Sequence, residues 1–541
     1  CDRLTRAMVR TLGSRAMNET FETMAMAAII AVALGAFLRQ RGWGIAIPLV
    51  IAGAVIGVLP VGPTAPPDPE VVLVAVLAPL VFGEALGSSY LDLRKVRRPV
   101  LVLAVGLVAA TTLGVGAVAA ALVAMPLAMA FALGAILAPT DAVAVSAVAR
   151  RAGLPRRMVS ILEGESLVND GTGLTALKVS LVAASAGAVT LLEVGRIFTA
   201  AVVVGVGVGA IGGYLLSLVL RRSKDLIPAN SLVLVAPFAL YALAEALDGS
   251  GILAVVVAAL FVANRQHADP GHAGRLQSVT LWKHLTFVLQ CLAFFLIGLE
   301  LPDVLSRVTR TDLRSLVILV PVVLVTLIVL RTVFVFAMIG MAKARRMEEG
   351  GTVRGAIIVS WAGARGPVSG LAAFTIPVAF ATGELVPARD LILATTFIII
   401  LLTLLLSITL TPLARALKIS SDDDSALLAR VDAQLARAAL DRLTDLEVEA
   451  MDAGTPVPAS VSDRLRGDVE RRLEAPSGLA TESTAADDGV ALAAELARAM
   501  IRAEQEELIT MRDAEGLPDA LVRPLLQQLD VRERALRSQR P

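Results

Sequence analysis

The sequence predicts an all-α polytopic membrane protein with thirteen transmembrane helices and a helical cytoplasmic tail. Of its 541 residues, 56% are hydrophobic and 18% are charged, and the mean hydropathy is +0.75. This composition is typical of membrane proteins and not of soluble globular domains. Apolar segments of about 20 residues, the length that crosses a bilayer, recur along the chain as far as residue 413. Lys and Arg gather in every second connection between these segments.

The apolar segments are bounded by charged residues, glycine or proline. In chain order they cover 21–38, 45–60, 70–88, 99–122, 126–149, 158–185, 193–219, 230–247, 251–265, 278–300, 315–340, 354–380 and 389–413. The basic connections contain Arg39 and Arg41; Arg94, Lys95, Arg97 and Arg98; Arg150, Arg151, Arg156 and Arg157; Arg221, Arg222 and Lys224; Arg265 and Arg275; Lys343, Arg345, Arg346 and Arg354; and Arg415 and Lys418. Because basic loops stay in the cytoplasm, we expect the amino end outside and the tail inside. Only the connection 301–314, with three arginines, departs from this alternation.

Three parts of the chain are therefore expected. Residues 1–20 carry four arginines on the side expected to be external and begin with Cys1. We interpret them as a doubtful amino-terminal extension, with translation starting near Met17 or Met24, or else as a targeting or surface segment. Residues 21–415 form the transmembrane domain. Residues 416–541 form a polar, helical cytoplasmic tail, which could be regulatory, a dimer contact or a partner-binding arm.

The sixth apolar segment contains an unusual polar stripe. It holds three carboxylates, Glu163, Glu165 and Asp170, together with Ser166 and Asn169. Ser166 and Asp170 are four residues apart, as are Glu165 and Asn169, so these four side chains share one side of a helix. Ionisable groups at this depth are costly and usually face a water-filled cavity where they bind ions or protons.

Helix breakers interrupt two further segments, each beside a charge. The fifth segment contains Pro139, Thr140 and Asp141, and the twelfth contains the run 361–367 around Arg365. Interrupted backbone inside a membrane is tolerated beside a polar cavity. The two segments are an odd number of spans apart and so run in opposite directions. Matching broken helices in the two halves are typical of an inverted-repeat secondary transporter. A plain proline kink is the alternative for the fifth segment alone.

Four separated motifs resemble a known family. The runs 138–145, 162–170, 294–301 and 361–369 (APTDAVAV, LEGESLVND, FFLIGLEL and WAGARGPVS) are similar to those of the monovalent cation:proton antiporters. The resemblance is to the branch of sodium/proton exchangers with an Asn-Asp pair in the ion-binding helix, and it covers residues 21–415. It implies thirteen transmembrane helices, a core domain that moves against a dimerisation domain, and a homodimer.

The chemistry of Asp170 suggests how exchange could arise. A carboxylate in a wet cavity holds either a proton or a hard cation such as Na⁺, so competition at one site couples the two ions under alternating access. Ser166 and Thr140 are expected to supply further oxygen ligands. Asn169 is neutral, so the pair Asn169-Asp170 has one titratable group. We therefore expect one Na⁺ (or Li⁺ or K⁺) to exchange for one proton without net charge movement.

The remaining intramembrane charges need partners, because removing one member of a buried pair costs about 3–5 kcal/mol. The resemblance implies that Glu165 pairs with Arg331 as a structural ion pair. It also implies that Asp141 and Arg365 lie near the ends of the broken helices, where they offset the helix dipoles. Glu84, in the third segment, either lines a cytoplasmic funnel or is buried in neutral form.

Other function classes have weaker support. A channel-like or uniporting cation carrier on the same fold is the main alternative. We expect no enzyme and no cofactor, because no metal motif, nucleophile elbow or cofactor motif occurs. The run 207–212 fits G-x-G-x-x-G but lies inside an apolar segment, which favours helix packing through small residues. The expected partners are Na⁺, H⁺, the lipid bilayer of the cell membrane and a second copy of the chain, with no nucleic acid.

Overall fold

The computed structural model of the chain is helical throughout the part described here. The structure describes residues 25–59, 73–141, 149, 153–186, 190–223, 225–266, 272–344, 352–380, 383–419, 424–474 and 490–538. Within these ranges the β structure is limited to one isolated bridge between Ala379 and Leu385. The expected amino-terminal extension and the second half of the fifth apolar segment, residues 142–148, lie outside the described residues.

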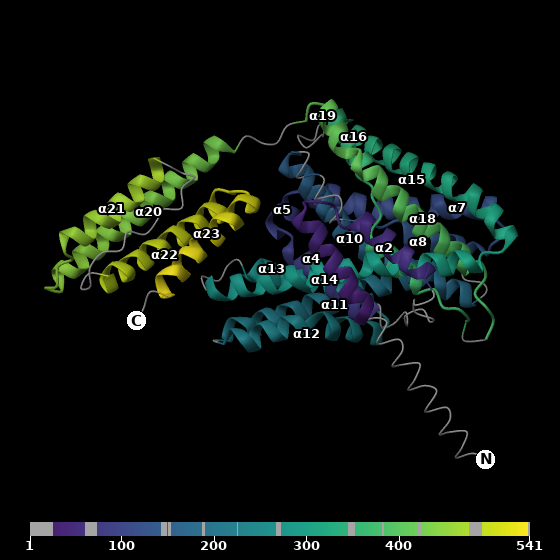
Figure 1. The fold of residues 1–541 in the computed structure, drawn as a ribbon, viewed down its shortest axis with the longest axis horizontal. Helices are drawn as coiled ribbons and strands as arrows, with labels where there is room; N and C mark the ends of the chain where they lie inside the picture. The colour runs from purple at the N-terminus through teal and green to yellow at the C-terminus, as the bar shows by residue number, and fades with distance from the viewer. Residues whose placement is uncertain are drawn as a thin grey trace, which may run out of the picture. The chain divides into compact units, whose positions relative to one another are not determined.

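The chain divides into two compact units. The first comprises residues 1–263 with 281–421, and the second comprises residues 264–280 with 422–541. Most of their helices are labelled in Figure 1. The first unit contains most of the helices, and α13 and α14 each have one end in the second unit. Two π-helical turns are named η1 and η2. In chain order the elements are Ala25–Gln40, α2 (Ala46–Val58), η1 (Leu73–Leu77), α4 (Ala78–Gly87), α5 (Tyr90–Lys95), α6 (Arg97–Leu101), η2 (Val102–Leu107), α7 (Val108–Leu122), α8 (Leu127–Leu137), α10 (Arg156–Ala186), α11 (Leu191–Arg222), α12 (Leu226–Ala246), α13 (Gly251–Gln266), α14 (His272–Arg307), α15 (Arg310–Ala344), α16 (Val353–Trp361), α17 (Pro367–Phe374), α18 (Arg389–Ile408) and α19 (Leu410–Ala416).

Six stretches in the described part of the chain are long and apolar enough to cross a membrane. They are Arg97–Leu122, Leu192–Arg222, Ile227–Ala246, Thr280–Arg307, Arg310–Met341 and Arg389–Ala416. Five shorter apolar helices accompany them, at Ala25–Gln40, Ala46–Val58, Leu73–Gly87, Leu127–Leu137 and Gly251–Asn264. The protein is therefore an integral membrane protein. Helices α11, α14 and α15 extend past the apolar segments expected from sequence into the polar residues that flank them, whereas α2 and α8 are shorter than expected.

The polar helix α10 lies among the helices that contain the breaks. It packs against α8, η2, α11 and α6, and α8 in turn packs against α7 and α17. The twelfth apolar segment forms two short helices, because α16 ends at Trp361 and α17 begins at Pro367. Pro367 has no N–H to donate, so the first helical position is where a proline fits best. Helix α8 ends at Leu137, two residues before Pro139.

Close helix packing explains the run 207–212. It lies inside the continuous helix α11, so it is not a dinucleotide loop. A Cβ at Gly209 would collide with the carbonyl oxygen of Ala254 on α13, and one at Gly213 would lie 2.8 Å from Cα of Ala258. A Cβ at Gly207 would meet nothing within 4 Å. Small residues at Gly209 and Gly213 therefore let α11 and α13 approach closely.

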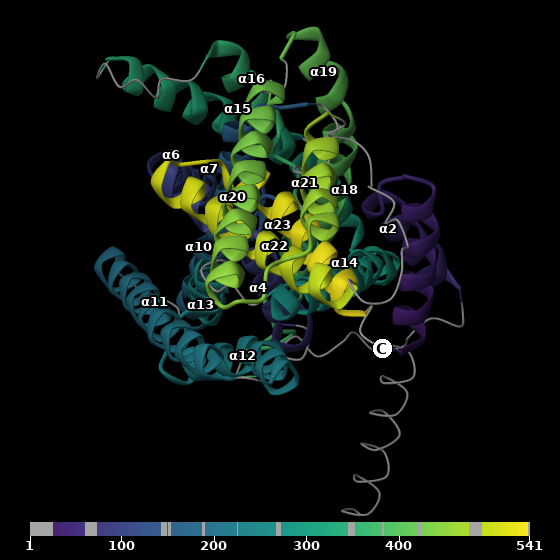
Figure 2. The ribbon, with the colours of Figure 1, turned by 90° about the vertical axis from the view of Figure 1, so that its left-hand side faces the viewer.

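The second unit contains the helices of the tail, α20 (Ser425–Asp452), α21 (Ala459–Glu474), α22 (Val490–Ala514) and α23 (Asp519–Ser538). Figure 2 shows α20 and α21 alongside α22 and α23. Two apolar clusters fill the space between them. The buried carboxylate of Glu504 on α22 pairs with Arg472 of α21 and Arg532 of α23, so one acidic side chain links three helices. Burial raises the pKa of the nearby Asp432 carboxyl on α20.

The glycine contacts of α11 give a stability prediction. Gly209→Val should lower the thermal midpoint of the detergent-purified protein, because the new side chain collides with backbone atoms of α13 and overpacking costs about 1–3 kcal/mol. Gly207→Val, the same change two residues earlier, has open space around it and should leave the midpoint nearly unchanged. Equal midpoints for the two variants would contradict this account of the packing.

Candidate functional site

The polar stripe of α10 is buried inside the first unit. Glu165 is 1% exposed, Asp170 is 2% exposed, and Ser166 and Asn169 are equally inaccessible. Thr172, which the sequence analysis did not single out, extends this polar face by donating to the carbonyl oxygen of Ala104 at 2.7 Å. Ala104 lies in the π-helical turn η2, so the irregular backbone there finds a partner on α10.

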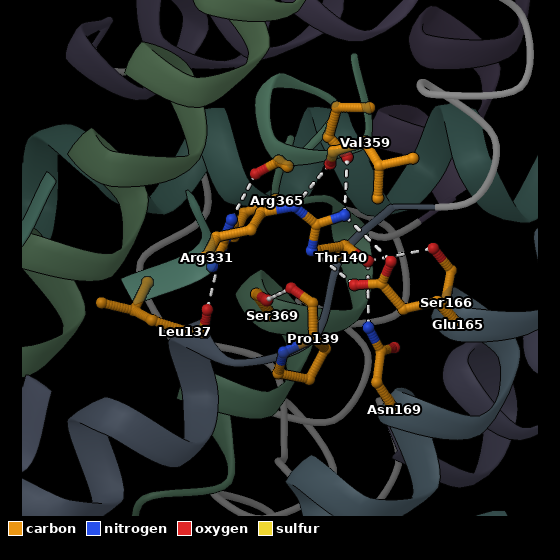
Figure 3. A network of polar contacts seen from close by, with 12 residues as sticks. Leu137, Pro139, Thr140, Glu165, Ser166, Asn169, Arg331, Val359, Arg365 and Ser369 are labelled. Carbon is orange, nitrogen blue, oxygen red and sulfur yellow. Dashed lines mark hydrogen bonds and ion pairs between the residues drawn. The ribbon is translucent and has the colours of Figure 1, made fainter. Parts of the chain in front are cut away.

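Three of the expected site residues share one hydrogen-bonded group, which we call the Thr140 group. The hydroxyls of Thr140 and Ser166 are 3.0 Å apart, and the Asn169 amide nitrogen donates to Thr140 Oγ1 at 2.9 Å. Figure 3 shows these side chains converging from two segments of the chain. The non-helical stretch after α8 is thereby fixed against the middle of α10.

The two interrupted segments meet at Asp141. The backbone N–H of Asp141 donates to the carbonyl oxygen of Ala364 at 2.9 Å. The Ser369 hydroxyl, on α17, donates to the carbonyl oxygen of Pro139 at 3.5 Å. A Cβ at Gly366 would collide with the side chain of Asp141, so the close approach requires glycine there. The crossing brings backbone polar groups of both segments next to the Thr140 group.

Arg331, from α15, joins α10 to the end of α16. Its guanidinium forms a bidentate ion pair with Glu165, in which Nη1 donates to Oε1 and Nη2 donates to Oε2 at 2.9 Å. Nε donates to the carbonyl oxygen of Val359 at 2.9 Å and Nη2 to that of Ala362 at 3.3 Å. These carbonyls belong to the last turn of α16 and the residue after it, where the helix leaves acceptors unpaired. Arg331 is 2% exposed, so the ion pair is shielded from solvent.

Arg365 likewise caps the carboxyl end of α8. Its Nε donates to the carbonyl oxygen of Leu137, the last residue of α8, at 2.8 Å. Its Nη1 also donates to the carbonyl oxygen of Gly363, and its backbone N–H donates to the Thr403 hydroxyl at 3.0 Å. A cation at a helix carboxyl end is favourable because the aligned peptide dipoles are negative there.

Oδ1 of Asn169, within the Thr140 group, and Oδ1 of Asp170, next to it in sequence, are buried without a hydrogen-bond donor among the described residues. The described residues contain no cluster of three His, Cys, Asp or Glu side chains that could hold a metal ion. The oxygens available here come from one carboxylate, one amide and two hydroxyls, a set that suits a hard cation or a proton.

Glu84 and Gln290 border the same region. Glu84, on α4, accepts a hydrogen bond from the amide nitrogen of Gln290 on α14 at 3.4 Å. Its carboxylate is near enough to Asp141 and Asp170 for the charges to repel one another. From sequence, Glu84 was expected either to line a cytoplasmic funnel or to be buried in neutral form. In the structure its side chain is half-buried beside the site. Gln290 was missed, and its one signal is an amide side chain inside an apolar run.

The chain is similar to known proteins over most of its length. Residues 25–416 match the family model described as sodium/hydrogen exchanger, transmembrane. A sodium, potassium, lithium and rubidium/H⁺ antiporter of Bacillus pumilus is 32% identical over 389 residues, 68% of this chain and 57% of that protein. An uncharacterised Na⁺/H⁺ exchanger of Mycobacterium bovis is 30% identical over 524 residues, 94% of this chain and 95% of that protein. The chain therefore spans little more than half the length of the Bacillus protein but nearly all of the mycobacterial one.

A solved structure shows the same fold. The sodium proton antiporter of Methanocaldococcus jannaschii at pH 8 superposes with a TM-score of 0.62 and 18% sequence identity. The match covers 74% of this chain and 99% of that chain.

The ion pair between α10 and α15 gives a prediction for stability. Glu165→Gln or Arg331→Ala alone should each lower the free energy of unfolding by about 3–5 kcal/mol, because each leaves one buried charge unpaired. The double variant should lose less than the sum, since neither charge remains. It should not recover fully, because the carbonyls of Val359 and Ala362 lose their donor. Thermal unfolding in detergent measures all three, and strictly additive losses would show that the two residues do not interact.

Proposed function

The chain belongs to the sodium/hydrogen exchanger family, and on that premise we propose that it exchanges Na⁺ for H⁺ by alternating access, with Asp170 binding the two ions in turn. The observation that carries this proposal is the buried Oδ1 of Asp170, which has no hydrogen-bond donor among the described residues. A buried carboxylate oxygen without a donor is costly, and binding either a proton or a cation removes that cost.

The neighbouring oxygens support a cation in this position. Ser166 lies one helical turn from Asp170 on α10, and Thr140 is 3.0 Å from Ser166. Both hydroxyls can turn a lone pair toward an ion, and the orphaned amide oxygen of Asn169 offers a further ligand. Na⁺ prefers such oxygen ligands. Li⁺ and K⁺ are the competing choices, and a flux assay with each chloride salt in everted vesicles distinguishes them.

The stoichiometry follows from which carboxylate can change its ligand. Glu165 is already balanced by Arg331 through the two-pronged ion pair, so its charge stays constant through the cycle. Asn169 is neutral and holds Thr140. Asp170 is then the member of this face that alternates, and with Glu84 and Asp141 keeping their protonation state through the cycle, one Na⁺ exchanges for one proton. The relatives described above carry names of antiporters or exchangers, which favours coupled exchange over a channel or uniporter.

The membrane arrangement is part of the same proposal. Residues 21–415 form thirteen spans, with the fifth and twelfth broken near the midplane, and the chain works as a homodimer in the cell membrane. Basic residues at the start of α10, including Arg156 and Arg157, favour a cytoplasmic position for that end, and the opposite end then faces outside. The helices of the tail then lie in the cytoplasm.

Replacing the carboxylate tests the central residue. Asp170→Asn should reduce Na⁺-driven proton movement in proteoliposomes to the level of empty vesicles, while the elution volume and thermal midpoint stay close to wild type. Glu163→Gln is the matched control, because Glu163 lies on the same helix about 10 Å along the axis and should leave exchange intact. Substantial exchange by the purified Asp170→Asn protein would rule Asp170 out as the shared site.

A potential imposed across the membrane tests the stoichiometry. If one Na⁺ exchanges for one proton, no net charge moves, and a valinomycin-imposed potential should leave the rate unchanged at fixed ion gradients. If one net charge crossed the membrane in each cycle, every 100 mV of membrane potential would change the driving force by about 2.3 kcal/mol. A clear acceleration or inhibition would mean that a second carboxylate, Glu84 or Asp141, also exchanges its proton during the cycle.

A further inference from the structure

Helix α10 has two opposite polar faces. At 100° per residue, Glu165, Ser166 and Asn169 lie between about 220° and 320° around the helix from Asp170. Gly171, Thr175 and Lys178 lie between about 80° and 140° on the same scale. The first face holds the Thr140 group and the ion pair with Arg331. The second face takes no part in those contacts.

The second face meets the turn that joins α12 to α13. Lys178 Nζ lies 2.7 Å from Oε2 of Glu245 and donates to the carbonyl oxygen of Gly249 at 3.0 Å. The Thr175 hydroxyl donates to that of Ser250 at 3.0 Å. One turn nearer to Asp170, a Cβ at Gly171 would lie 2.7 Å from the Leu253 side chain. We call this set of contacts the outer contact.

The turn is also held by α11, α12 and α13, independently of its contacts with α10. Glu245 Oε1 accepts the N–H of Gly251 at 3.0 Å, and the N–H of Ser250 donates to the carbonyl oxygen of Ala201 on α11 at 2.9 Å. A Cβ at Gly205 would lie 2.6 Å from the carbonyl oxygen of Ser250, so α11 touches the turn directly. Together with the glycine contacts between α11 and α13, these bonds make the three helices one packed body.

The two faces of α10 differ in how easily they separate. The side chains of Arg331 and Glu165 are 3% and 1% exposed, so breaking their ion pair would strand charges away from water. The side chains of Lys178 and Glu245 are each 34% exposed, so parting them leaves less charge buried inside the protein than parting Arg331 from Glu165 would. Ion pairs exposed to this degree add little free energy and can break and re-form. α10 therefore separates more easily from the α12–α13 turn than from the helices on its first face.

We propose that the outer contact closes the external route to Asp170, and that rupture of the Lys178–Glu245 ion pair is a required step of opening to the outside. Lys178 lies eight residues beyond Asp170, about 12 Å along the helix, on the side away from Arg156. Gly171 and Leu253 close the space directly beside Asp170, and Thr175, Ser250 and the ion pair continue that closure outward. This inference rests on the proposed function and orientation, because it assigns the Lys178 end of α10 to the external side.

Access to a cysteine tests the closure without measuring transport. In a Cys1→Ser, Cys291→Ser background, Thr175→Cys is labelled from outside with a membrane-impermeant maleimide in intact cells. Adding Glu245→Gln or Lys178→Met should raise the labelling rate about three- to fivefold, the population shift expected from losing an exposed ion pair. Glu245→Gln retains the acceptor for the Gly251 N–H, so the turn itself stays intact. Lys178→Arg should keep the slow rate.

Asp303→Asn is the matched control. It breaks the exposed Arg307–Asp303 ion pair, which joins residues of one helix, and should leave labelling unchanged. Equal labelling rates with and without the Lys178–Glu245 pair would overturn the proposal. Because labelling needs no ion flux, it also distinguishes failure of the outer contact from failure of Na⁺/H⁺ exchange by the unmodified protein.

A disulfide across the outer contact provides a second test. In the same background, Thr175→Cys with Ser250→Cys places two thiols where the hydroxyls are 3.0 Å apart, which suits a disulfide. Oxidation should stop exchange and dithiothreitol should restore it, whereas either single cysteine should exchange ions under both conditions. Full exchange by the oxidised double variant would show that this contact need not open, and failure of the disulfide to form would show that the closed contact does not exist in the membrane.

Discussion

Unpaired backbone carbonyls at the helix breaks are the constraint on which this structure depends. A membrane interior offers no water to satisfy them, so each break needs its own donors. Arg331 supplies these at the end of α16, and Arg365 supplies one at the end of α8. Each arginine comes from another segment, so the caps also fix α15 and the twelfth segment in place. Glu165 then neutralises Arg331, which attaches α10 to the same assembly.

Residue spacing in the sequence predicts which side chains of α10 share a face, but it does not predict their contacts with other segments. Residues four apart on α10 had to share a face, so grouping Ser166 with Asp170 needed only helical geometry. The bond from Asn169 to Thr140 joins segments 29 residues apart and has no local signal. The pairing of Glu165 with Arg331 came from the family resemblance, because many other arginines were available. Gln290 was missed since one amide in an apolar run looks like a tolerated surface residue.

The contact between α10 and the α12–α13 turn was hidden from sequence for a different reason. Gly171 and Thr175 are ordinary residues of a helix, and Lys178 was overlooked among the charges inside the apolar segments. Their shared face becomes visible only against the turn that follows α12. The glycines of α11 matched a nucleotide-binding pattern while serving helix packing. Small residues in membrane helices thus carry little information until the neighbouring helix is known. The π-helical turns η1 and η2 likewise have no clear signal in composition.

The hydrogen bond between the Thr140 and Ser166 hydroxyls can run in either direction. Thr140 Oγ1 has two lone pairs, and one of them receives the amide of Asn169. If Thr140 donates its proton to Ser166, its second lone pair is free for a cation. If Ser166 donates to Thr140 instead, both lone pairs are occupied and Thr140 cannot be a ligand. Rotation of the two O–H bonds therefore changes the coordination number that the site offers, with no movement of any heavy atom.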